Sequence, residues 1–285
     1  MRWRDRRGSQ NVEDRRGSGF ARKAGGGGIG VIVLALVAMY FGVDPSIILN
    51  QGGSMLGGSG TDAVQYQPTA EEEELAGFVA VVLADTEDAW NKLFERMGRR
   101  YQEPKLVLFS GSVRSACGLG EAAMGPFYCP GDQKAYIDLS FYRDLKTRHQ
   151  APGDFAQAYV IAHEIGHHVQ NLLGISDKVQ QVRKQLNRAE SNALSVKLEL
   201  QADCLAGVWA HDADRTRQLL ESGDVEEALN AASAIGDDRL QKQARGYVTP
   251  ESFTHGTSAQ RVFWFKTGLE NGEMNACNTF ESKRI

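Results

Sequence analysis

The chain has 285 residues, enough for one sizeable domain or two small ones and for a buried active site. Its formal net charge of -4 is unevenly spread, because the first 23 residues hold eight basic and three acidic side chains (net +5), leaving 24 basic and 33 acidic ones (net -9) for the rest. An acidic main part argues against nucleic acid as a partner, since phosphate binding needs a clustered positive field.

The N-terminal residues predict a membrane anchor. Residues 1–24 form a basic tail, and residues 25–45 contain an uncharged, strongly apolar stretch from Ile29 to Val43. A spanning helix needs about 20 apolar residues and a signal-peptide core about 7–15, so the length alone does not decide. The long basic tail, and the lack of a small-residue cleavage site before Asp44, favour a retained single-pass anchor over a cleaved signal or a buried core helix. The positive-inside rule then predicts a cytoplasmic N-terminus and a periplasmic or extracellular main domain.

The remaining chain predicts one folded domain of mostly helical α+β class with a small β-sheet. Residues 46–68 are rich in Gly and Ser and predict a flexible linker, so we expect the domain at 69–285. Runs of strand-forming residues predict β-strands at 105–109 and 135–139. Apolar residues at helical spacing predict helices at 71–94, 154–173 with Asp154 as N-cap, 177–213, 215–221, 224–235, 239–246 and 258–269.

Four cysteines follow the predicted anchor: Cys117, Cys129, Cys204 and Cys277. In an exported domain four cysteines allow three disulfide connectivities, and the sequence does not choose among them. We favour a local bridge between the first two, which flank a glycine-rich turn, leaving the other two to pair. A four-cysteine zinc site is disfavoured because no two of them form a Cys-x-x-Cys pair.

The segment His163-Glu164-Ile165-Gly166-His167 is a candidate zinc motif in the helix predicted at 154–173. Residues four apart lie on one face of a helix, so His163 and His167 can bind one metal ion. Glu164 can reach a water beside the metal without being a ligand. This is the general-base role of the glutamate in peptidases with a His-Glu-x-x-His motif. Gly166 weakens a helix by about 1 kcal/mol, so we expect a closely packed neighbour there. His168 is rotated by about 100° and is expected to face away from the metal.

A catalytic zinc needs a third protein ligand and an open position. Glu199 and Asp203 lie one turn apart on the next predicted helix. Glu199 can bind the metal, while Asp203 can accept a hydrogen bond from the far nitrogen of a ligand histidine. The alternative, that both are ordinary surface acids, is outweighed by the upstream histidines.

The pairing of the His163 motif with Glu199-x-x-Ala202-Asp203 resembles the gluzincin metallopeptidases. More of the chain is similar to the bacterial neutral zinc metallopeptidase family, sometimes called the YpfJ-type, from about Thr69 to Cys277 and including the basic tail and anchor. The segments that carry this similarity are Cys117-Gly118, Gly125 to Pro130, Tyr136 to Leu139, Gly236 to Asp238 and Thr254 to Arg261.

The resemblance implies that the cofactor is Zn²⁺, bound by His163, His167 and Glu199. It further implies that Glu164 activates the water and that Asp203 supports a ligand.

Two residues keep open assignments. The thermolysin-like group uses an additional histidine to stabilise the oxyanion, and His255 is our hypothesis for that donor. Its alternative is a turn histidine that caps the helix at 258. Arg261 can pair with Asp203 or bind a substrate carboxylate, and the sequence does not decide.

These patterns together predict a membrane-anchored zinc endopeptidase that acts on peptides or proteins. The alternative is a non-catalytic scaffold of the cell envelope, or a peptide-binding protein, in which the zinc is structural.

Overall fold

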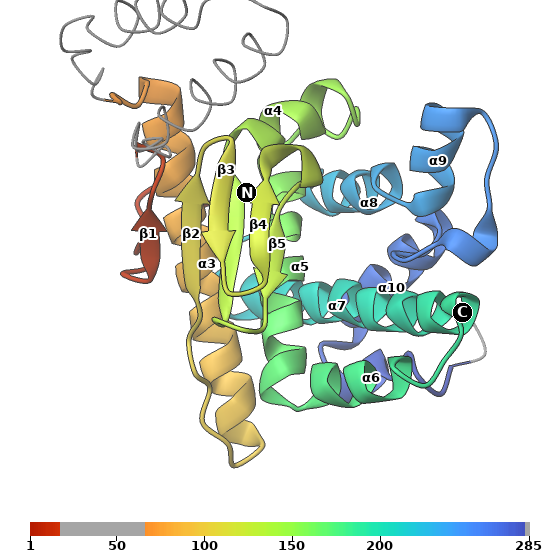
Figure 1. The fold of residues 1–285 in the computed structure, drawn as a ribbon. Helices are drawn as coiled ribbons and strands as arrows, with labels where there is room; N and C mark the ends of the chain where they lie inside the picture. The colour runs from red at the N-terminus through yellow and green to blue at the C-terminus, as the bar shows by residue number, and fades with distance from the viewer. Residues whose placement is uncertain (18–65, 283–285) are drawn as a thin grey trace, which may run out of the picture. The chain divides into compact units, whose positions relative to one another are not determined.

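The computed structural model describes residues 1–17 and 66–282. Met1–Arg15 and Pro68–Ile285 form one compact unit, shown as a ribbon in Figure 1. The anchor predicted at 25–45 and most of the linker predicted at 46–68 lie outside the described residues. Within the described part of the chain, no helix has both the length and the apolar character needed to cross a membrane.

A four-stranded sheet has the order β1-β2-β6-β5. Its strands are β1 (Val12–Asp14), β2 (Lys105–Phe109), β5 (Phe127–Cys129) and β6 (Lys134–Asp138). The first three in the sheet order are parallel, and β5 pairs with β6 in the antiparallel direction at one edge. Strands β3 (Ser112–Ser115) and β4 (Gly118–Glu121) form a separate hairpin. The two predicted strands are confirmed as β2 and β6.

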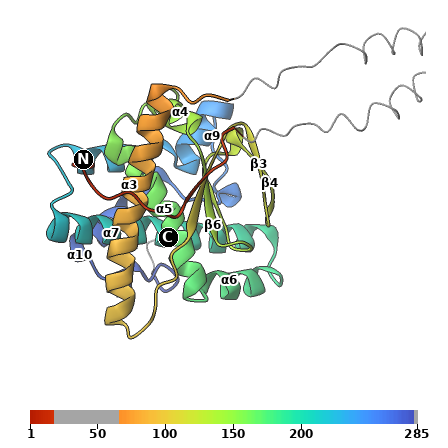
Figure 2. The same cartoon turned by 90° about the vertical axis from the view of Figure 1, so that its left-hand side faces the viewer.

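The sheet is buried on both faces, because alternate residues of β2 and β6 pack into different clusters. Leu106 and Leu108 join the main core of helices, whereas Val107 and Phe109 pack with Tyr136 and residues of the β3 hairpin and β5. The main core contains α3 (Ala70–Arg96) and α5 (Asp154–Leu172), which lie on one side of the sheet in Figure 2.

The mostly helical α+β class is confirmed. The remaining helices are α4 (Ser140–Thr147), α6 (Ile175–Arg183), α7 (Arg188–Arg217), α8 (Asp224–Ala234), α9 (Asp237–Arg245) and α10 (Ser258–Asn271), with short 3-10 helices η1 (Ala122–Met124), η2 (Pro250–Ser252) and η3 (Met274–Cys277). α7 and α10 pack in direct backbone contact, since a Cβ on Gly268 would lie 1.9 Å from the carbonyl oxygen of Cys204.

The starts of α3 and α5 lie within one residue of their predicted positions. α3 begins after Thr69, whose side chain forms a capping box with Glu72. α5 begins at Asp154, but its N-cap is Gly153, so the predicted cap is one residue too late.

The single helix predicted at 177–213 is wrong, because α6 ends at Arg183 and a second capping box, between Asn187 and Glu190, starts α7. The helix predicted at 215–221 is also wrong. α7 continues to Arg217, and Gln218 then takes a left-handed conformation that ends it.

The basic N-terminal segment was predicted as a tail outside the domain, and its described part corrects this. Met1–Arg15 belong to the same compact unit as the rest of the domain. β1 pairs with β2, the backbone N–H of Ser9 donates to the carbonyl of Ala80, and the Met1 ammonium lies 2.6 Å from a carboxylate oxygen of Asp154. These contacts are between residues far apart in the sequence, so composition alone does not reveal them.

Candidate metal centre

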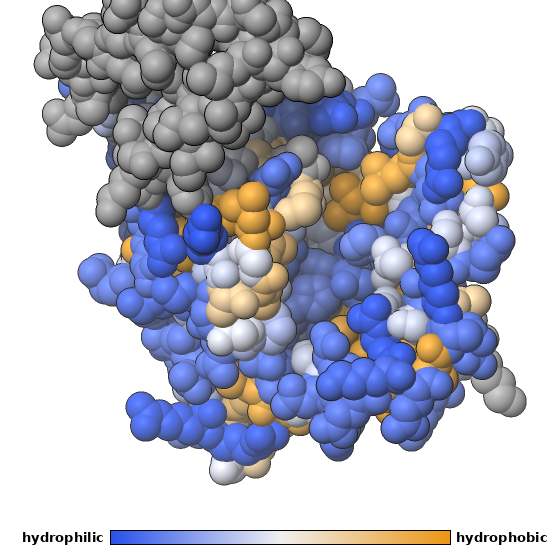
Figure 3. All heavy atoms as spheres, viewed as in Figure 1, coloured by the Kyte–Doolittle hydropathy of each residue, from blue (hydrophilic) through white to orange (hydrophobic). Residues whose placement is uncertain are grey.

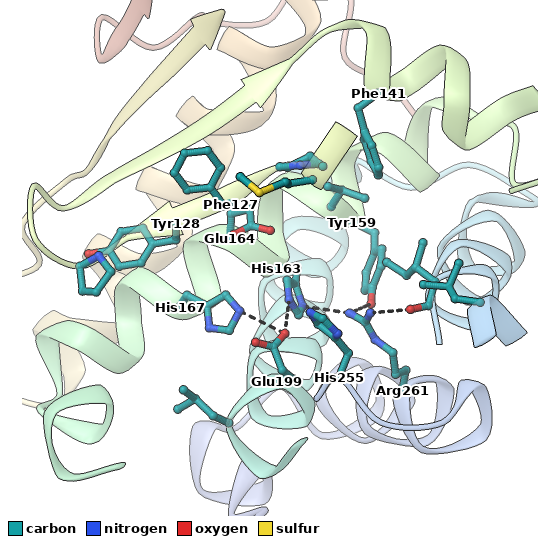
Figure 4. Close-up of a pocket in the computed structure, with 18 of the residues that line it drawn as sticks. Phe127, Tyr128, Phe141, Tyr159, His163, Glu164, His167, Glu199, His255 and Arg261 are labelled. Atoms are coloured by element: carbon teal, nitrogen blue, oxygen red, sulfur yellow. Dashed lines mark hydrogen bonds and ion pairs between the residues drawn. The ribbon is translucent and has the colours of Figure 1, made fainter. Parts of the chain in front are cut away.

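Two packed helices bring the three predicted ligands together. α5 carries His163 and His167, and α7 carries Glu199. Oε2 of Glu199 lies 3.2 Å from Nε2 of His163 and 3.4 Å from Nε2 of His167, as the dashed lines in Figure 4 mark. Donor atoms bonded at about 2.0–2.1 Å around a tetrahedral zinc ion are separated by about 3.3–3.4 Å. Two imidazoles and one carboxylate at this spacing therefore fit Zn²⁺ and leave a fourth position for a substrate or water.

The close approach of α5 to α7 depends on Gly166. A Cβ at this position would lie 2.9 Å from the carbonyl oxygen of Ala202, which is closer than real Cβ atoms approach. The expected close neighbour is thus the backbone of α7, between Glu199 and Asp203. The glycine inside the motif sets the distance between the two helices that carry the ligands.

Asp203 orients the first histidine. Nδ1–H of His163 donates to Oδ1 of Asp203 at 2.8 Å, which leaves Nε2 directed at Glu199. Burial favours the neutral form of Asp203, but the charges of Arg261 and His163 outweigh it and lower its pKa to about 2. Burial likewise opposes the charge on His163, but Asp203 and Glu199 together raise its pKa to about 10 in the metal-free site. Zinc binding must therefore release this proton.

Gln170 orients the second histidine, and the sequence analysis missed it. Nδ1–H of His167 donates to the amide oxygen of Gln170 at 2.9 Å. The amide nitrogen of Gln170 donates in turn to the carbonyl of Leu198 at 2.7 Å and to Gln201 at 3.1 Å. A side chain one turn beyond the ligand on the same helix face is the only signal that the sequence offered for it.

Glu164 is placed as a proton acceptor. It is buried, and its carboxylate faces the cavity above His163 in Figure 4. No hydrogen bond or ion pair joins it to another side chain of the described residues. Burial raises its pKa, although the charges on His163 and His167 act in the opposite direction. A carboxylate held beside a metal position without a fixed partner is free to exchange a proton with a substrate or water.

The site opens into a cleft of about 490 Å³, a volume that suits a segment of peptide or a small ligand. Figure 3 shows a hollow near the centre of this face of the molecule, with apolar side chains on its upper rim. The apolar lining includes Met124, Phe127, Phe141, Val160, Ile235 and Leu240. β5 is the edge strand of the sheet, and its residues Phe127 and Tyr128 border the cleft.

His255 lines the same cleft, close to Glu199 and Arg261 in Figure 4. Its backbone N–H donates to the carboxylate of Asp237 at 2.6 Å, and its Nδ1 lies 3.3 Å from the other oxygen. Burial lowers its pKa, but Asp237 and the charge of Glu199 raise it above the usual value overall. The cap of α10 is the side chain of Thr257, so His255 does not cap this helix.

His168 faces away from the ligands, as expected. Its Nε2–H donates to the carbonyl of Gln102 at 2.6 Å, and its Nδ1 accepts from the hydroxyl of Tyr128 at 2.9 Å. Burial lowers its pKa to about 4, so this histidine is neutral and structural.

The favoured disulfide pairing is confirmed: Cys117 bonds to Cys129, and Cys204 bonds to Cys277.

A second group of acids, Asp154, Asp224 and Glu227, also has the spacing of a metal site. The ammonium group of Met1 lies against Asp154 and Asp224, so this group already has a cationic partner.

Comparison with known proteins agrees with the geometry of this centre. A family model described as "Putative neutral zinc metallopeptidase" matches residues 1–280. The YpfJ protein of Escherichia coli (strain K12) is 53% identical over an alignment of 293 residues. The alignment covers 98% of this chain and 99% of the relative. The Rv2575 protein of Mycobacterium tuberculosis (strain H37Rv) is 41% identical over 260 residues, covering 86% and 85%. No solved structure matches. The chain therefore belongs to the neutral zinc metallopeptidase family, whose cofactor is Zn²⁺.

Proposed function

We propose that the protein is a zinc-dependent endopeptidase in which Glu164 is the general base. The observation that carries this proposal is the buried carboxylate of Glu164, which has no hydrogen-bond or ion-pair partner among the described residues and lies beside three ligands that leave one position open. Bound Zn²⁺ supplies positive charge that polarises the scissile carbonyl and makes a nearby water more acidic. Glu164 takes a proton from the water as the water oxygen bonds to the carbonyl carbon. The same carboxylate then gives the proton to the amide nitrogen as the C–N bond breaks.

The edge strand supports a peptide substrate. β5 has β6 on one side only, and its residues Phe127 and Tyr128 border the cleft. An extended peptide can add to such an edge through backbone hydrogen bonds. We therefore infer that an unfolded segment of a peptide or protein lies along β5 and crosses the metal position.

Stepwise zinc loading tests the proposed activity on the full chain. Zinc is removed with a chelator and restored in measured amounts, and hydrolysis of unfolded casein is followed by the appearance of new amino groups. Hydrolysis is expected to rise with zinc content up to one ion per chain. Activity in the zinc-free protein, or none at full loading, would falsify the proposal.

His255 is our candidate for the donor that stabilises the oxyanion. It lies in the cleft, its side chain is half exposed, and Asp237 holds the ring through Nδ1. His255→Ala is expected to lower kcat by about 10²–10³-fold, the usual effect of removing one oxyanion donor. Zinc content, measured by atomic absorption, should not change, because His255 is not among the ligands.

A second histidine of the cleft is the matched control for this variant. His149 lines the same cleft but lies two residues after α4, outside the ligand group. His149→Ala should leave kcat close to that of the wild type. A kcat for His255→Ala that equals the wild-type value would remove His255 from the mechanism.

We further propose that the domain lies outside the cytoplasm, with Met1–Arg15 on the same side of the membrane. The two disulfides support an oxidising compartment. The topology expected from the positive-inside rule would place a membrane between β1 and β2, but these strands are hydrogen-bonded to each other. A shared side for both segments avoids this conflict, and it replaces the single-pass topology with a cytoplasmic N-terminus that the sequence predicts.

Cysteine labelling tests the shared side. All four native cysteines are paired, so a new cysteine supplies a single free thiol. The side chains of Arg4 and Glu74 are exposed, and Nη2 of Arg4 lies 2.7 Å from Oε1 of Glu74. Arg4→Cys and Glu74→Cys are therefore a matched pair. In intact spheroplasts, a membrane-impermeant maleimide is expected to label both variants equally. Labelling of Glu74→Cys alone, with Arg4→Cys reacting only after lysis, would contradict the shared side and show that the N-terminus is cytoplasmic.

A further inference from the structure

We infer that Arg261 and Tyr159 are positioning residues for the metal centre, which hold Asp203 and, through it, the imidazole of His163. The inference rests on the zinc centre of the proposed function. It concerns how tightly that centre holds its metal, so it can be tested without an assay of peptide hydrolysis.

Three helices contribute to this support. Tyr159 lies one turn before His163 on α5, Asp203 is on α7, and Arg261 is on α10. Nε–H of Arg261 donates to one carboxylate oxygen of Asp203 at 2.8 Å, and Nη2–H donates to the other at 2.8 Å. The hydroxyl of Tyr159 donates to the same carboxylate and accepts from Nη2 of Arg261 at 3.1 Å. Figure 4 shows the guanidinium beside the Tyr159 hydroxyl, on the side of His163 away from Glu164.

Asp203 is fully buried and its carboxylate is held by donors from the protein. Three donors reach Oδ1, from His163, Tyr159 and Nη2 of Arg261, and Nε–H of Arg261 reaches Oδ2. The carboxylate is thus held in one orientation by a bidentate charged contact, which is the strong and directional kind. Because Oδ1 of Asp203 in turn fixes Nδ1–H of His163, this orientation aims Nε2 at the metal.

Most of the N–H donors of Arg261 already have acceptors within the domain. Its Nη1 donates to the carbonyl of Ile235 at 3.3 Å, so four of the five guanidinium N–H groups have partners inside the domain. Its side chain is only 3% exposed. Of the two assignments that the sequence left open, the geometry favours pairing with Asp203 over binding a substrate carboxylate.

The two ligand histidines therefore have unlike supports. His167 is held by the neutral amide of Gln170, whereas His163 is held by an ionised carboxylate that an arginine keeps in place. Outer-shell partners of this kind typically change metal affinity by about 10–100-fold. The structure thus assigns to α10, whose described residues include none of the three candidate ligands, an influence on zinc affinity that acts through Asp203.

The test measures the zinc dissociation constant of the full chain by competition with a chromogenic chelator. Arg261→Met keeps an unbranched side chain about as long as the arginine stem and removes the guanidinium donors, and Tyr159→Phe removes one hydroxyl. Both are expected to weaken zinc binding, by about 10–100-fold for Arg261→Met and by less for Tyr159→Phe, which keeps the arginine contact. Tyr159→Phe is the more conservative change and remains informative if Arg261→Met does not fold.

Arg217 supplies a matched control. It makes a similar double contact with Asp85, at 2.6 and 3.0 Å, but lies fourteen residues beyond Asp203 on α7, about 21 Å along the helix. Arg217→Met should lower the Tm of the metal-free protein and leave the zinc dissociation constant unchanged. Wild-type affinity in the Arg261 or Tyr159 variant would overturn the inference. An equal loss of affinity in Arg217→Met would also overturn it, by tracing the effect to general destabilisation.

Discussion

Replacing Glu164 with glutamine is expected to lower the rate of peptide hydrolysis by about 10²–10⁴-fold while zinc still binds at one ion per chain. Glutamine keeps the shape of the side chain, but its amide does not take up a proton at neutral pH. Glu164 is not among the ligand atoms that cluster around the metal position, so the affinity for zinc should change little. The measurement is kcat/KM on a peptide substrate, with zinc content determined on the same sample.

The matched control is a second carboxylate of the same cleft. Asp144 lines the cleft, where it forms an exposed ion pair with Arg148 at 3.3 Å. Asp144→Asn should retain most of the activity, because an exposed pair of this kind contributes little. Equal hydrolysis by wild type and Glu164→Gln would exclude the proposed base. The zinc would then be structural, as in the non-catalytic scaffold that the sequence also allows.

The pH profile offers an independent view of the same group. Burial raises the pKa of Glu164, so its carboxylate becomes protonated at a higher pH than an exposed glutamate would. Only the ionised form can take the proton from water. Hydrolysis is therefore expected to be retained above this raised pKa and lost as the pH falls through it. Zinc content is measured at each pH, because protonation of the ligand histidines also releases the metal. The acidic limb of kcat/KM should be the same in Asp144→Asn, because that variant does not alter the base.

The candidate ligands could be predicted because each pair is local in sequence. His163 and His167 are one turn apart, as are Glu199 and Asp203, and helical geometry places each pair on one face. Tyr159 and Gln170 continue the same face of α5 in either direction, but tyrosine and glutamine on a helix are usually ordinary core or surface residues. Their roles follow from contacts with α7, which the spacing along α5 does not contain.

Arg261 illustrates the limit of the sequence more clearly. It lies 58 positions beyond Asp203, and only the packing of α10 against α7 brings the two together. That packing depends on small residues such as Gly268, which allow the helix backbones to touch. The sequence alone names this pairing as one of two assignments for Arg261 and does not choose between them.

The fold shows the same division between local and distant signals. The helix starts at Thr69 and Asn187 are both encoded by capping boxes, although the second was overlooked within a long charged segment. β1 has only three residues and lies within the basic segment that precedes the apolar stretch, so its sequence predicts a tail and not a strand. Its strand conformation comes from the edge of β2, because a short polar segment has little preference of its own.

Replacing Glu199 with glutamine is expected to weaken zinc binding more strongly than any change to the residues that support the ligands. The variant removes the only negative charge among the three ligand atoms and leaves two histidines as effective ligands. The loss should exceed the roughly 10–100-fold that an outer-shell change costs. Peptide hydrolysis should fall with zinc occupancy and recover in part when excess zinc is added.

The comparison with Asp203→Asn makes this prediction discriminating. Asp203 is one turn further along the same helix, but its oxygens are already occupied by His163, Tyr159 and Arg261. Its replacement should therefore cost only about 10–100-fold in zinc affinity, because the three ligands remain. Both dissociation constants are measured by chelator competition at one pH, since the ligand histidines bind zinc only after they lose a proton. A greater loss in Asp203→Asn than in Glu199→Gln would exchange the two roles and make Asp203 the ligand.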